Sequence, residues 1–98
     1  MLERTVEQHL ITTVAQLCGA CYKFEVRGVR GYPDRIVKLP GVEAFLVELK
    51  RPKGGVVSEV QKVRHAELRA LGWRVYLAKD RGEVDAIIKK EMLGRHGE

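Results

Sequence analysis

One stretch of the sequence, residues 44–78, constrains the fold more than any other. It holds four consecutive patterns: an apolar, β-prone run at 44–50 (AFLVELK), a basic loop at 51–57 (RPKGGVV), a helical pattern at 58–71 and a β-prone run at 73–78 (WRVYLA). Ser58 and Gln61 match the S-x-x-Q capping box that begins helices, and Gly72 is a typical helix stop. Two strands joined by one helix predict a parallel pair with a right-handed crossover.

The rest of the chain predicts two more helices and two more strands with short connections. The patterns are a helix at 5–18, a strand at 21–27, a turn at 28–33, a strand at 34–39 and a last helix from about 80 to about 93. Thr5 and Gln8 match a capping box at the first helix, with Gly19 as its stop, and Asp80 and Glu83 cap the last helix. The first three strands can form an antiparallel meander, so we expect an α/β fold with a mixed four-stranded sheet flanked by helices.

Length and charge limit the classes of protein that this chain can represent. With 98 residues it is expected to form one domain spanning 1–93, followed by a frayed tail at 94–98. No apolar run reaches the ~18 residues of a membrane helix and the N-terminus is charged, which indicates a soluble cytoplasmic protein. The net charge is +5, and residues 23–53 hold eight basic and four acidic residues. This concentration favours a nucleic-acid partner about as much as it favours a solvated basic face.

Three residues near strand ends are the most informative about chemistry. Glu48 and Lys50 are two positions apart on one predicted strand, so their side chains project from the same face while Leu49 points into the core. If the strand that begins at Asp34 is the neighbour, its carboxylate lies across from Glu48. Two carboxylates and the Leu49 carbonyl then offer oxygen ligands to Mg²⁺, and Lys50 can orient water and stabilise developing charge. The plainer interpretation is a solvated Glu–Lys pair at a strand end.

In its order of motifs, the sequence resembles the PD-(D/E)xK nuclease superfamily and, within it, the VRR-NUC family. The residues that carry the resemblance span most of the chain: Glu7, Gly31-Tyr32-Pro33-Asp34, Glu48-Leu49-Lys50, Ser58, Gln61, Leu68 and Gly72. The resemblance implies a restriction-endonuclease-like αβββαβ core with a C-terminal helix, and the activity of an Mg²⁺- or Mn²⁺-dependent DNA endonuclease. It also implies a homodimer that cuts branched DNA, as Holliday-junction resolvases do, in a bacterial or phage-infected cell.

The resemblance assigns roles to individual residues as well. Asp34 and Glu48 become metal ligands, and Lys50 becomes the catalytic lysine. Glu7 becomes an acid on the first helix that reaches the metal directly or through water, and Gln61 becomes a residue that supports the site. Judged without the resemblance, Glu7 is a rim charge beside an apolar stripe, and Gln61 is the partner of the helix cap.

Basic residues near these motifs are the candidate contacts to DNA. They are Arg30, Arg51, Lys53, Lys62 and His65. Arg51 and Lys53 lie in a glycine-containing loop where backbone amides can approach phosphate closely, although an ordinary surface loop explains the pattern equally well. For His65, a merely exposed position is the favoured interpretation.

Three other activities stay open. A non-catalytic DNA-binding module would use the same basic face, and a flap or nicking nuclease would share the site but choose another substrate. A sequence-specific restriction enzyme would need more surface for reading bases than a chain of 98 residues offers. Cutting of a labelled four-way junction by the wild-type protein, but not by Lys50→Ala, would distinguish an enzyme from a binding module.

Overall fold

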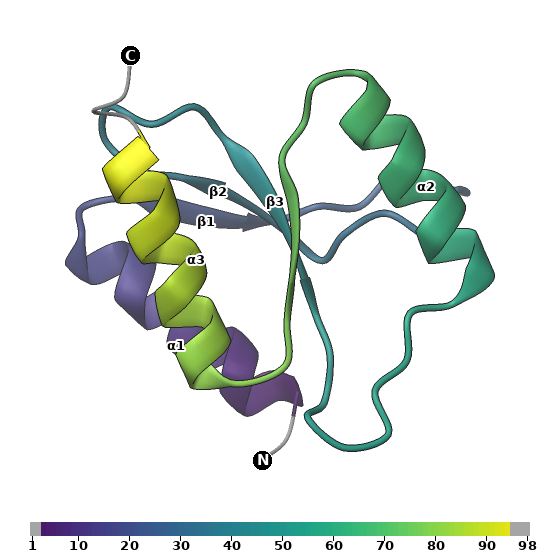
Figure 1. Ribbon diagram of the computed structural model, residues 1–98, viewed down its shortest axis with the longest axis horizontal. Helices are drawn as coiled ribbons and strands as arrows, with labels where there is room; N and C mark the ends of the chain where they lie inside the picture. Colours follow the sequence, from purple (N-terminus) through teal and green to yellow (C-terminus); the bar gives the residue numbers. More distant parts are fainter. Residues whose placement is uncertain (1–2, 95–98) are drawn as a thin grey trace.

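The structure, a computed structural model, describes residues 3–94. Its elements are α1 (Glu3–Gln16), β1 (Ala20–Lys23), β2 (Arg35–Lys38), β3 (Phe45–Leu49), α2 (Glu59–Ala70), β4 (Val75–Ala78) and α3 (Arg81–Gly94). Their order is the one predicted from the sequence: a helix, three strands, a helix, a strand and a last helix (Figure 1). No helix within the described range is long and apolar enough to cross a membrane.

The strands form one mixed sheet in the order β1-β2-β3-β4. β1 is antiparallel to β2, and β2 is antiparallel to β3, whereas β3 is parallel to β4. The connection from β3 to β4 runs through α2, as a parallel pair requires. The predicted antiparallel meander and the predicted parallel pair joined through a helix are therefore both confirmed.

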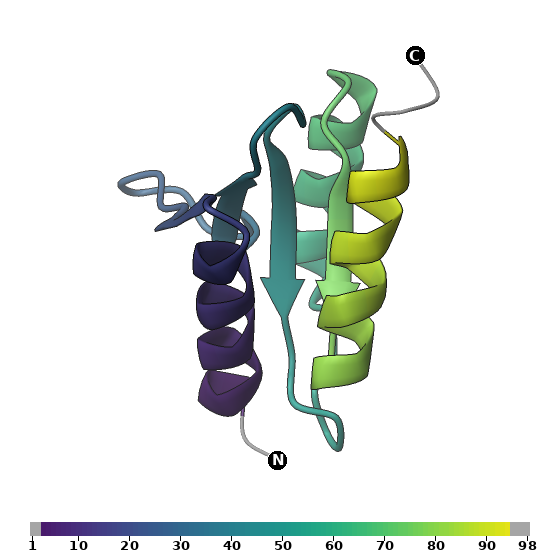
Figure 2. The ribbon, with the colours of Figure 1, turned by 90° about the vertical axis from the view of Figure 1, so that its left-hand side faces the viewer.

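Helices cover both faces of the sheet, with α1 and α3 on one face and α2 on the other (Figures 1 and 2). The larger core lies under α1 and α3, and its members include Leu10, Val37, Phe45, Val47, Leu49 and Ile88. A smaller core lies under α2 and consists of Leu46, Leu68 and Val75, with Phe24, Tyr32, Ile36 and Trp73 packed against it. The sheet therefore has a mostly apolar face and a face with less apolar cover.

The side chains of β3 alternate between the two faces of the sheet, and this alternation determines which core each of them joins. All five residues of this strand are buried. Phe45, Val47 and Leu49 belong to the larger core, and Leu46 belongs to the smaller core. Glu48 therefore faces α2, because successive side chains of a strand point to opposite faces. A carboxylate is thus buried in a strand whose other residues are all apolar.

The start and the end of the first helix differ from the prediction. Thr5 lies inside α1, so the capping box predicted with Gln8 does not form. The residue in the left-handed conformation after the helix is Cys18, with a φ of 64°, rather than the predicted stop Gly19. Gly19 has a different role, because a Cβ there would lie 2.5 Å from the carbonyl oxygen of Lys38.

The strand predicted at 21–27 is too long, because β1 ends at Lys23. Beyond it the chain forms a tight turn, in which Val29 N–H donates to the carbonyl of Val26 at 3.1 Å and the two residues form an isolated bridge. Gly28 supplies the left-handed φ of 77° that this turn needs. The turn therefore interrupts the predicted strand.

The C-terminal part follows the prediction closely. Glu83 N–H donates to Asp80 Oδ1 at 2.8 Å, which confirms the predicted cap of α3. The strand before it is shorter than predicted and starts at Val75. α3 extends to Gly94, so the first residue of the predicted tail is helical, and residues 95–98 lie outside the described residues.

Candidate active site

Asp34, directly before β2, and Glu48, near the end of β3, lie at the same end of the sheet. The register pairs Arg35 with Val47, so Asp34, one position before, comes opposite Glu48, one position after. Leu49 N–H donates to Asp34 Oδ2 at 2.7 Å, which holds the Asp34 side chain against this end of β3. The predicted position of Asp34 across from Glu48 is confirmed.

The Glu48 carboxylate is 1% exposed and lies among three polar side chains. Lys50 Nζ lies 3.6 Å from Glu48 Oε2, and Gln61 Nε2 donates to the same oxygen at 3.0 Å. His65 Nε2 lies 3.3 Å from the other oxygen, Oε1, but the two atoms are not in hydrogen-bonding geometry. Within the described part of the chain, Glu48 Oε1 and His65 Nε2 are both buried without a hydrogen-bond partner.

Burial and a neighbouring carboxylate disfavour the charged form of Glu48. Loss of water, together with the neighbouring Asp34 and against the opposing effect of Lys50, raises the pKa of Glu48 to about 8. Burial also lowers the pKa of His65, and Arg69 and Lys50 act in the same direction. The cluster therefore holds a carboxylate whose negative charge its own neighbours do not fully compensate.

The start of α2 orients Gln61 toward Glu48. Gln61 N–H donates to Ser58 Oγ at 3.2 Å, and Ser58 N–H donates to Gln61 Oε1 at 3.0 Å. This pair of bonds is the capping box predicted from the sequence. Because the cap holds the amide oxygen, the amide nitrogen is directed at Glu48. One side chain therefore serves both the helix start and the candidate site.

His65 is buried, whereas the sequence favoured an exposed position. The residue is 5% exposed and lies four positions after Gln61, so both side chains lie on the same side of α2. This side covers Glu48, and a buried imidazole does not offer itself to a DNA phosphate as predicted. The spacing of four from Gln61 was the signal that could have placed His65 at the site.

Glu7 does not join the Glu48 cluster. Arg35 Nε donates to Glu7 Oε2 at 3.0 Å, because Arg35 alternates onto the face of the sheet that α1 covers. Glu7 and Asp34 do line one groove. However, the described residues contain no group of three or more His, Cys, Asp and Glu side chains that could hold a metal ion. The structure thus brings together Asp34 and Glu48 but not the predicted third acid.

The other predicted DNA contacts are exposed residues around this end of the sheet: Arg30, Arg51, Lys53 and Lys62. Arg30 lines a groove together with Lys50 and Gln61. Lys62 Nζ lies 3.2 Å from Glu59 Oε1 on the surface of α2. Arg30 therefore lies beside the site, whereas Lys62 already has an acidic partner.

The loop after Lys50 folds back on itself. A Cβ at Gly55 would lie 2.4 Å from the carbonyl oxygen of Arg51 and 3.0 Å from Lys50 Cβ, so only glycine fits there. Gly54 supplies a left-handed φ of 79°. The folded loop keeps the basic residues Arg51 and Lys53 next to the strand end that carries Lys50.

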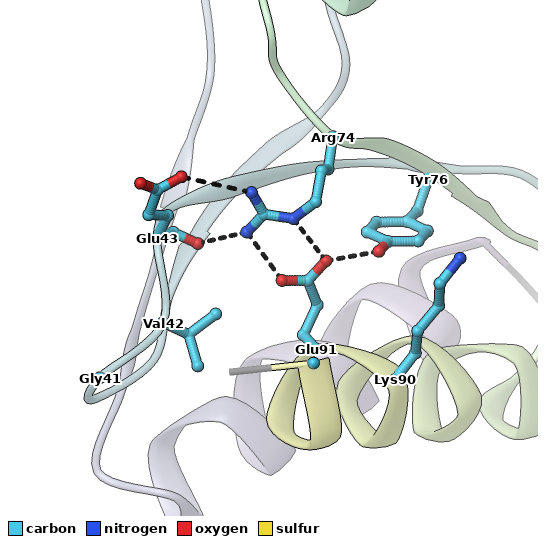
Figure 3. Close-up of a pocket in the computed structure, with 8 residues that line it drawn as sticks. Gly41, Val42, Glu43, Arg74, Tyr76, Lys90 and Glu91 are labelled. Carbon is cyan, nitrogen blue, oxygen red and sulfur yellow. Dashed lines mark hydrogen bonds and ion pairs between the residues drawn. The ribbon is translucent and has the colours of Figure 1, made fainter. Parts of the chain in front are cut away.

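A second buried carboxylate, Glu91 of α3, lies at the opposite end of the parallel strand pair and lines a separate pocket (Figure 3). Glu91 accepts hydrogen bonds from Arg74 Nε and Nη2, both at 2.7 Å, and from the Tyr76 hydroxyl. Arg74 Nη2 also donates to the backbone carbonyl of Glu43 at 2.7 Å. Burial alone would raise the pKa of Glu91, but the bonds from Arg74 and Tyr76 outweigh it and lower that pKa.

The chain is similar to known proteins in sequence and in fold, although no family model matches it. It is 42% identical over 73 residues to "Putative nuclease p44" of Acyrthosiphon pisum secondary endosymbiont phage 1, covering 74% of this chain and 77% of that protein. A solved structure described as "VRR_NUC domain" superposes with a TM-score of 0.82 at 26% identity, covering 89% of this chain and 94% of that chain. A "VRR_NUC domain protein", 18% identical, has the same fold, with a TM-score of 0.72 over 95% of this chain and 89% of that one. The chain therefore belongs to the VRR_NUC family.

Proposed function

We propose that this protein is a metal-dependent DNA endonuclease that hydrolyses phosphodiester bonds at the end of the sheet marked by Asp34, Glu48 and Lys50. The observation that carries the proposal is the buried Glu48 carboxylate, whose neighbours leave its charge incompletely compensated. A second carboxylate lies opposite, and an ammonium group lies 3.6 Å away. The 42% identity to a phage protein named as a nuclease supports the same class of activity.

The residues of this cluster fit a divalent cation. Mg²⁺ binds through oxygen, commonly with one or two carboxylates, and keeps several waters. Asp34, Glu48 and the Leu49 carbonyl would hold the ion, and the Glu48 carboxylate, which accepts one hydrogen bond from the described residues, keeps lone pairs free for it. Such an ion, Mg²⁺ or Mn²⁺, would activate water and neutralise charge that develops on the phosphate.

The surrounding side chains have tasks that follow from their positions. Lys50 Nζ provides a positive charge beside Glu48, where it can orient the attacking water and stabilise the negative charge of the transition state. Gln61 holds one oxygen of Glu48 through a bond of 3.0 Å. Asp34 is held by the Leu49 N–H at 2.7 Å, so each of the two acids has one oxygen anchored before a ligand arrives.

The proposed substrate is branched DNA, cut by a homodimer. The net charge of +5 favours a polyanion, and Arg30, Arg51 and Lys53 are exposed near the site, where they can contact the DNA backbone. Each chain carries one cluster of Asp34, Glu48 and Lys50. Two symmetric cuts in a four-way junction therefore require two copies, which a two-fold dimer supplies.

Nicking of a labelled four-way junction tests the activity. We expect the wild-type protein to cut with Mg²⁺ or Mn²⁺ and not with EDTA, and Lys50→Ala to lose at least about 100-fold in rate while still binding DNA. Lys89→Ala removes an exposed lysine from α3 and should cut like wild type. If the wild-type protein binds DNA but cuts it with neither Mg²⁺ nor Mn²⁺, the proposal is contradicted and a DNA-binding module is indicated.

Substrate choice and assembly need separate measurements. Plain duplex, flap and four-way junction, compared at equal concentration, should be cut at clearly different rates, with the junction fastest. Equal rates on all three would contradict the proposed selectivity for branches. Sedimentation of the protein should give the mass of a dimer, and a monomer that still makes paired cuts would contradict the homodimer.

A further inference from the structure

We infer that His65 is a positioning residue that holds the Oε1 atom of Glu48, the oxygen that Gln61 does not bind. The inference rests on the proposed nuclease function, because the orientation of this carboxylate matters most if it binds a metal ion. It gives His65 a task inside the protein in place of the DNA contact expected from the sequence.

The two oxygens of Glu48 have different neighbours. Oε2 accepts from Gln61 Nε2 at 3.0 Å and lies 3.6 Å from Lys50 Nζ. Oε1 accepts no hydrogen bond from the described residues, and His65 Nε2 lies 3.3 Å from it. A carboxylate held through one oxygen can still rotate, whereas one held through both oxygens has a fixed plane. His65 is the group placed to supply the second contact.

Packing alone does not explain a histidine at this position. The residue is 5% exposed, and a buried polar group left without a hydrogen bond destabilises the folded state. Leu68, three positions later on α2, is 6% exposed and packs in the smaller core with Leu46 and Val75. An apolar side chain is therefore accommodated under the same helix. The group that faces the imidazole, Glu48, explains why the residue is polar.

A small change of geometry would complete the contact. The separation of 3.3 Å lies just beyond the usual range for an N–H···O bond, and the atoms are not yet aligned. A neutral imidazole with its proton on Nε2 can donate to an ionised carboxylate. Hydrogen bonds of this kind orient metal-binding side chains and typically contribute 10–100-fold in metal affinity.

Binding of Mn²⁺ to the full chain, measured from the electron paramagnetic resonance of free Mn²⁺, tests the inference without catalysis. His65→Phe keeps a ring but removes the donor, and we expect the Kd for Mn²⁺ to rise roughly 10–100-fold. His65→Gln restores an N–H donor and should bring the Kd back to within about threefold of wild type. His9→Gln is the matched control, because His9 is a partly exposed histidine paired with Asp85, and it should not change the Kd.

Crystal structures of the metal-free protein provide a readout that does not depend on metal binding. We expect His65 Nε2 to be hydrogen-bonded to Glu48 Oε1, and the carboxylate of Glu48 to change its orientation in His65→Phe. If His65→Phe is too unstable to measure by thermal unfolding, His65→Leu replaces it, because Leu68 shows that an apolar side chain fits beneath α2.

The outcomes separate the two proposals. Wild-type affinity for Mn²⁺ in the folded Phe or Leu variant, or an unchanged Glu48 orientation in either, would overturn the role of His65. Failure of His65→Gln to restore the affinity would overturn it as well, since packing rather than a donor would then be what matters. If the wild-type protein binds no Mn²⁺, the proposed metal site fails, and the crystallographic comparison alone decides about His65.

Discussion

Glu48 and Glu91 are both buried glutamates, and their surroundings differ in a way that separates function from structure. Glu91 accepts two hydrogen bonds from one guanidinium, that of Arg74, and a third from the Tyr76 hydroxyl (Figure 3). Glu48 accepts one hydrogen bond from a neutral amide, and its second oxygen has no hydrogen-bond partner among the described residues. The two carboxylates lie at opposite ends of the same parallel pair of strands.

The pKa values express this difference. The pKa of Glu91 is lowered because the hydrogen bonds from Arg74 and Tyr76 outweigh burial, whereas burial and Asp34 raise the pKa of Glu48 to about 8. A buried carboxylate whose charge and hydrogen bonds are fully met by its neighbours has a structural role. A buried carboxylate whose negative charge is not balanced by its neighbours is unfavourable in its ionised form until a further positive charge binds beside it. The ionised form of Glu48 thus favours binding of a cation.

Glu48→Gln should produce the largest effect, because it removes the charge that binds the metal and preserves the shape of the side chain. We expect the rate of junction nicking to fall by about 10³-fold or more, which corresponds to about 4 kcal/mol of transition-state stabilisation. The Tm of the metal-free variant should be unchanged at pH 7, where Glu48 with a pKa of about 8 is mostly protonated, and higher than wild type at pH 8.5, where a poorly compensated buried charge is lost. Single-turnover nicking and thermal unfolding measure the two quantities. A clear loss of metal-free stability would make Glu48 a structural residue.

Glu91→Gln should show the reverse pattern. The substitution weakens charge-assisted hydrogen bonds from Arg74, so we expect the free energy of unfolding to fall by about 2 kcal/mol. Nicking at saturating metal should stay within about threefold of wild type, because this residue is remote from the proposed site. Urea denaturation gives the stability change. Loss of activity in a variant that remains folded would show that the two ends of the sheet are coupled.

The pH dependence of stability offers a third way to distinguish the two glutamates. The pKa of Glu48 is about 8 in the folded protein and 4.5 ordinarily. Between these two pH values the folded state holds a proton on Glu48 that the unfolded state has released. The metal-free protein should therefore lose stability, by about 1–2 kcal/mol, as pH rises from 6.5 to 8.5. Burial lowers the pKa of His65 from 6.5, which moves its titration away from this window.

Two variants and one ligand identify the source of this pH effect. Glu48→Gln should abolish the loss of stability between pH 6.5 and 8.5, whereas Glu91→Gln should retain it. The contribution of Glu91 lies at lower pH, because a lowered pKa gives stability that is present above its ordinary value of 4.5 and lost as pH falls through the folded pKa. Saturating Mg²⁺ should restore stability at pH 8.5. A flat wild-type profile would contradict the assignment.

Much of the site could be predicted because it depends on local rules. The period of two in a strand places Glu48 and Lys50 together and Leu49 opposite, and a short connection between strands brings Asp34 across from Glu48. The helix cap at Ser58 is a four-residue pattern and was equally accessible. These features need no knowledge of how distant elements pack.

The features that were missed depend on tertiary packing or on exact chain ends. The burial of His65 follows from the rotation of α2 over the sheet. The apolar periodicity of this mostly polar helix does not fix that rotation, and the spacing of four from Gln61 was the available signal. The pairing of Glu7 with Arg35 follows from the face that Arg35 occupies, and here alternation from Asp34 was an available signal. The start of α1 was misplaced because Thr5 and Gln8 match a capping box inside an already helical segment.

The smallest expected effect comes from the two helix caps, which extend the comparison from the glutamates to the helices that cover them. Ser58 caps α2 and Asp80 caps α3. Ser58→Ala and Asp80→Ala should each lower the free energy of unfolding by about 1 kcal/mol. Only the first should also slow nicking, by roughly 3- to 10-fold, because the cap holds the amide of Gln61 that binds Glu48.

Comparison of these two alanine variants isolates positioning from stability, since the loss of stability is matched while the link to Glu48 is not. Urea denaturation checks that the two losses agree, and single-turnover nicking at saturating metal then gives the rates. Equal rates in Ser58→Ala and Asp80→Ala would mean that Gln61 reaches Glu48 without help from the cap. A slower Ser58→Ala would show that the catalytic carboxylate depends on how α2 begins, a dependence that the completed ion pair of Glu91 does not have.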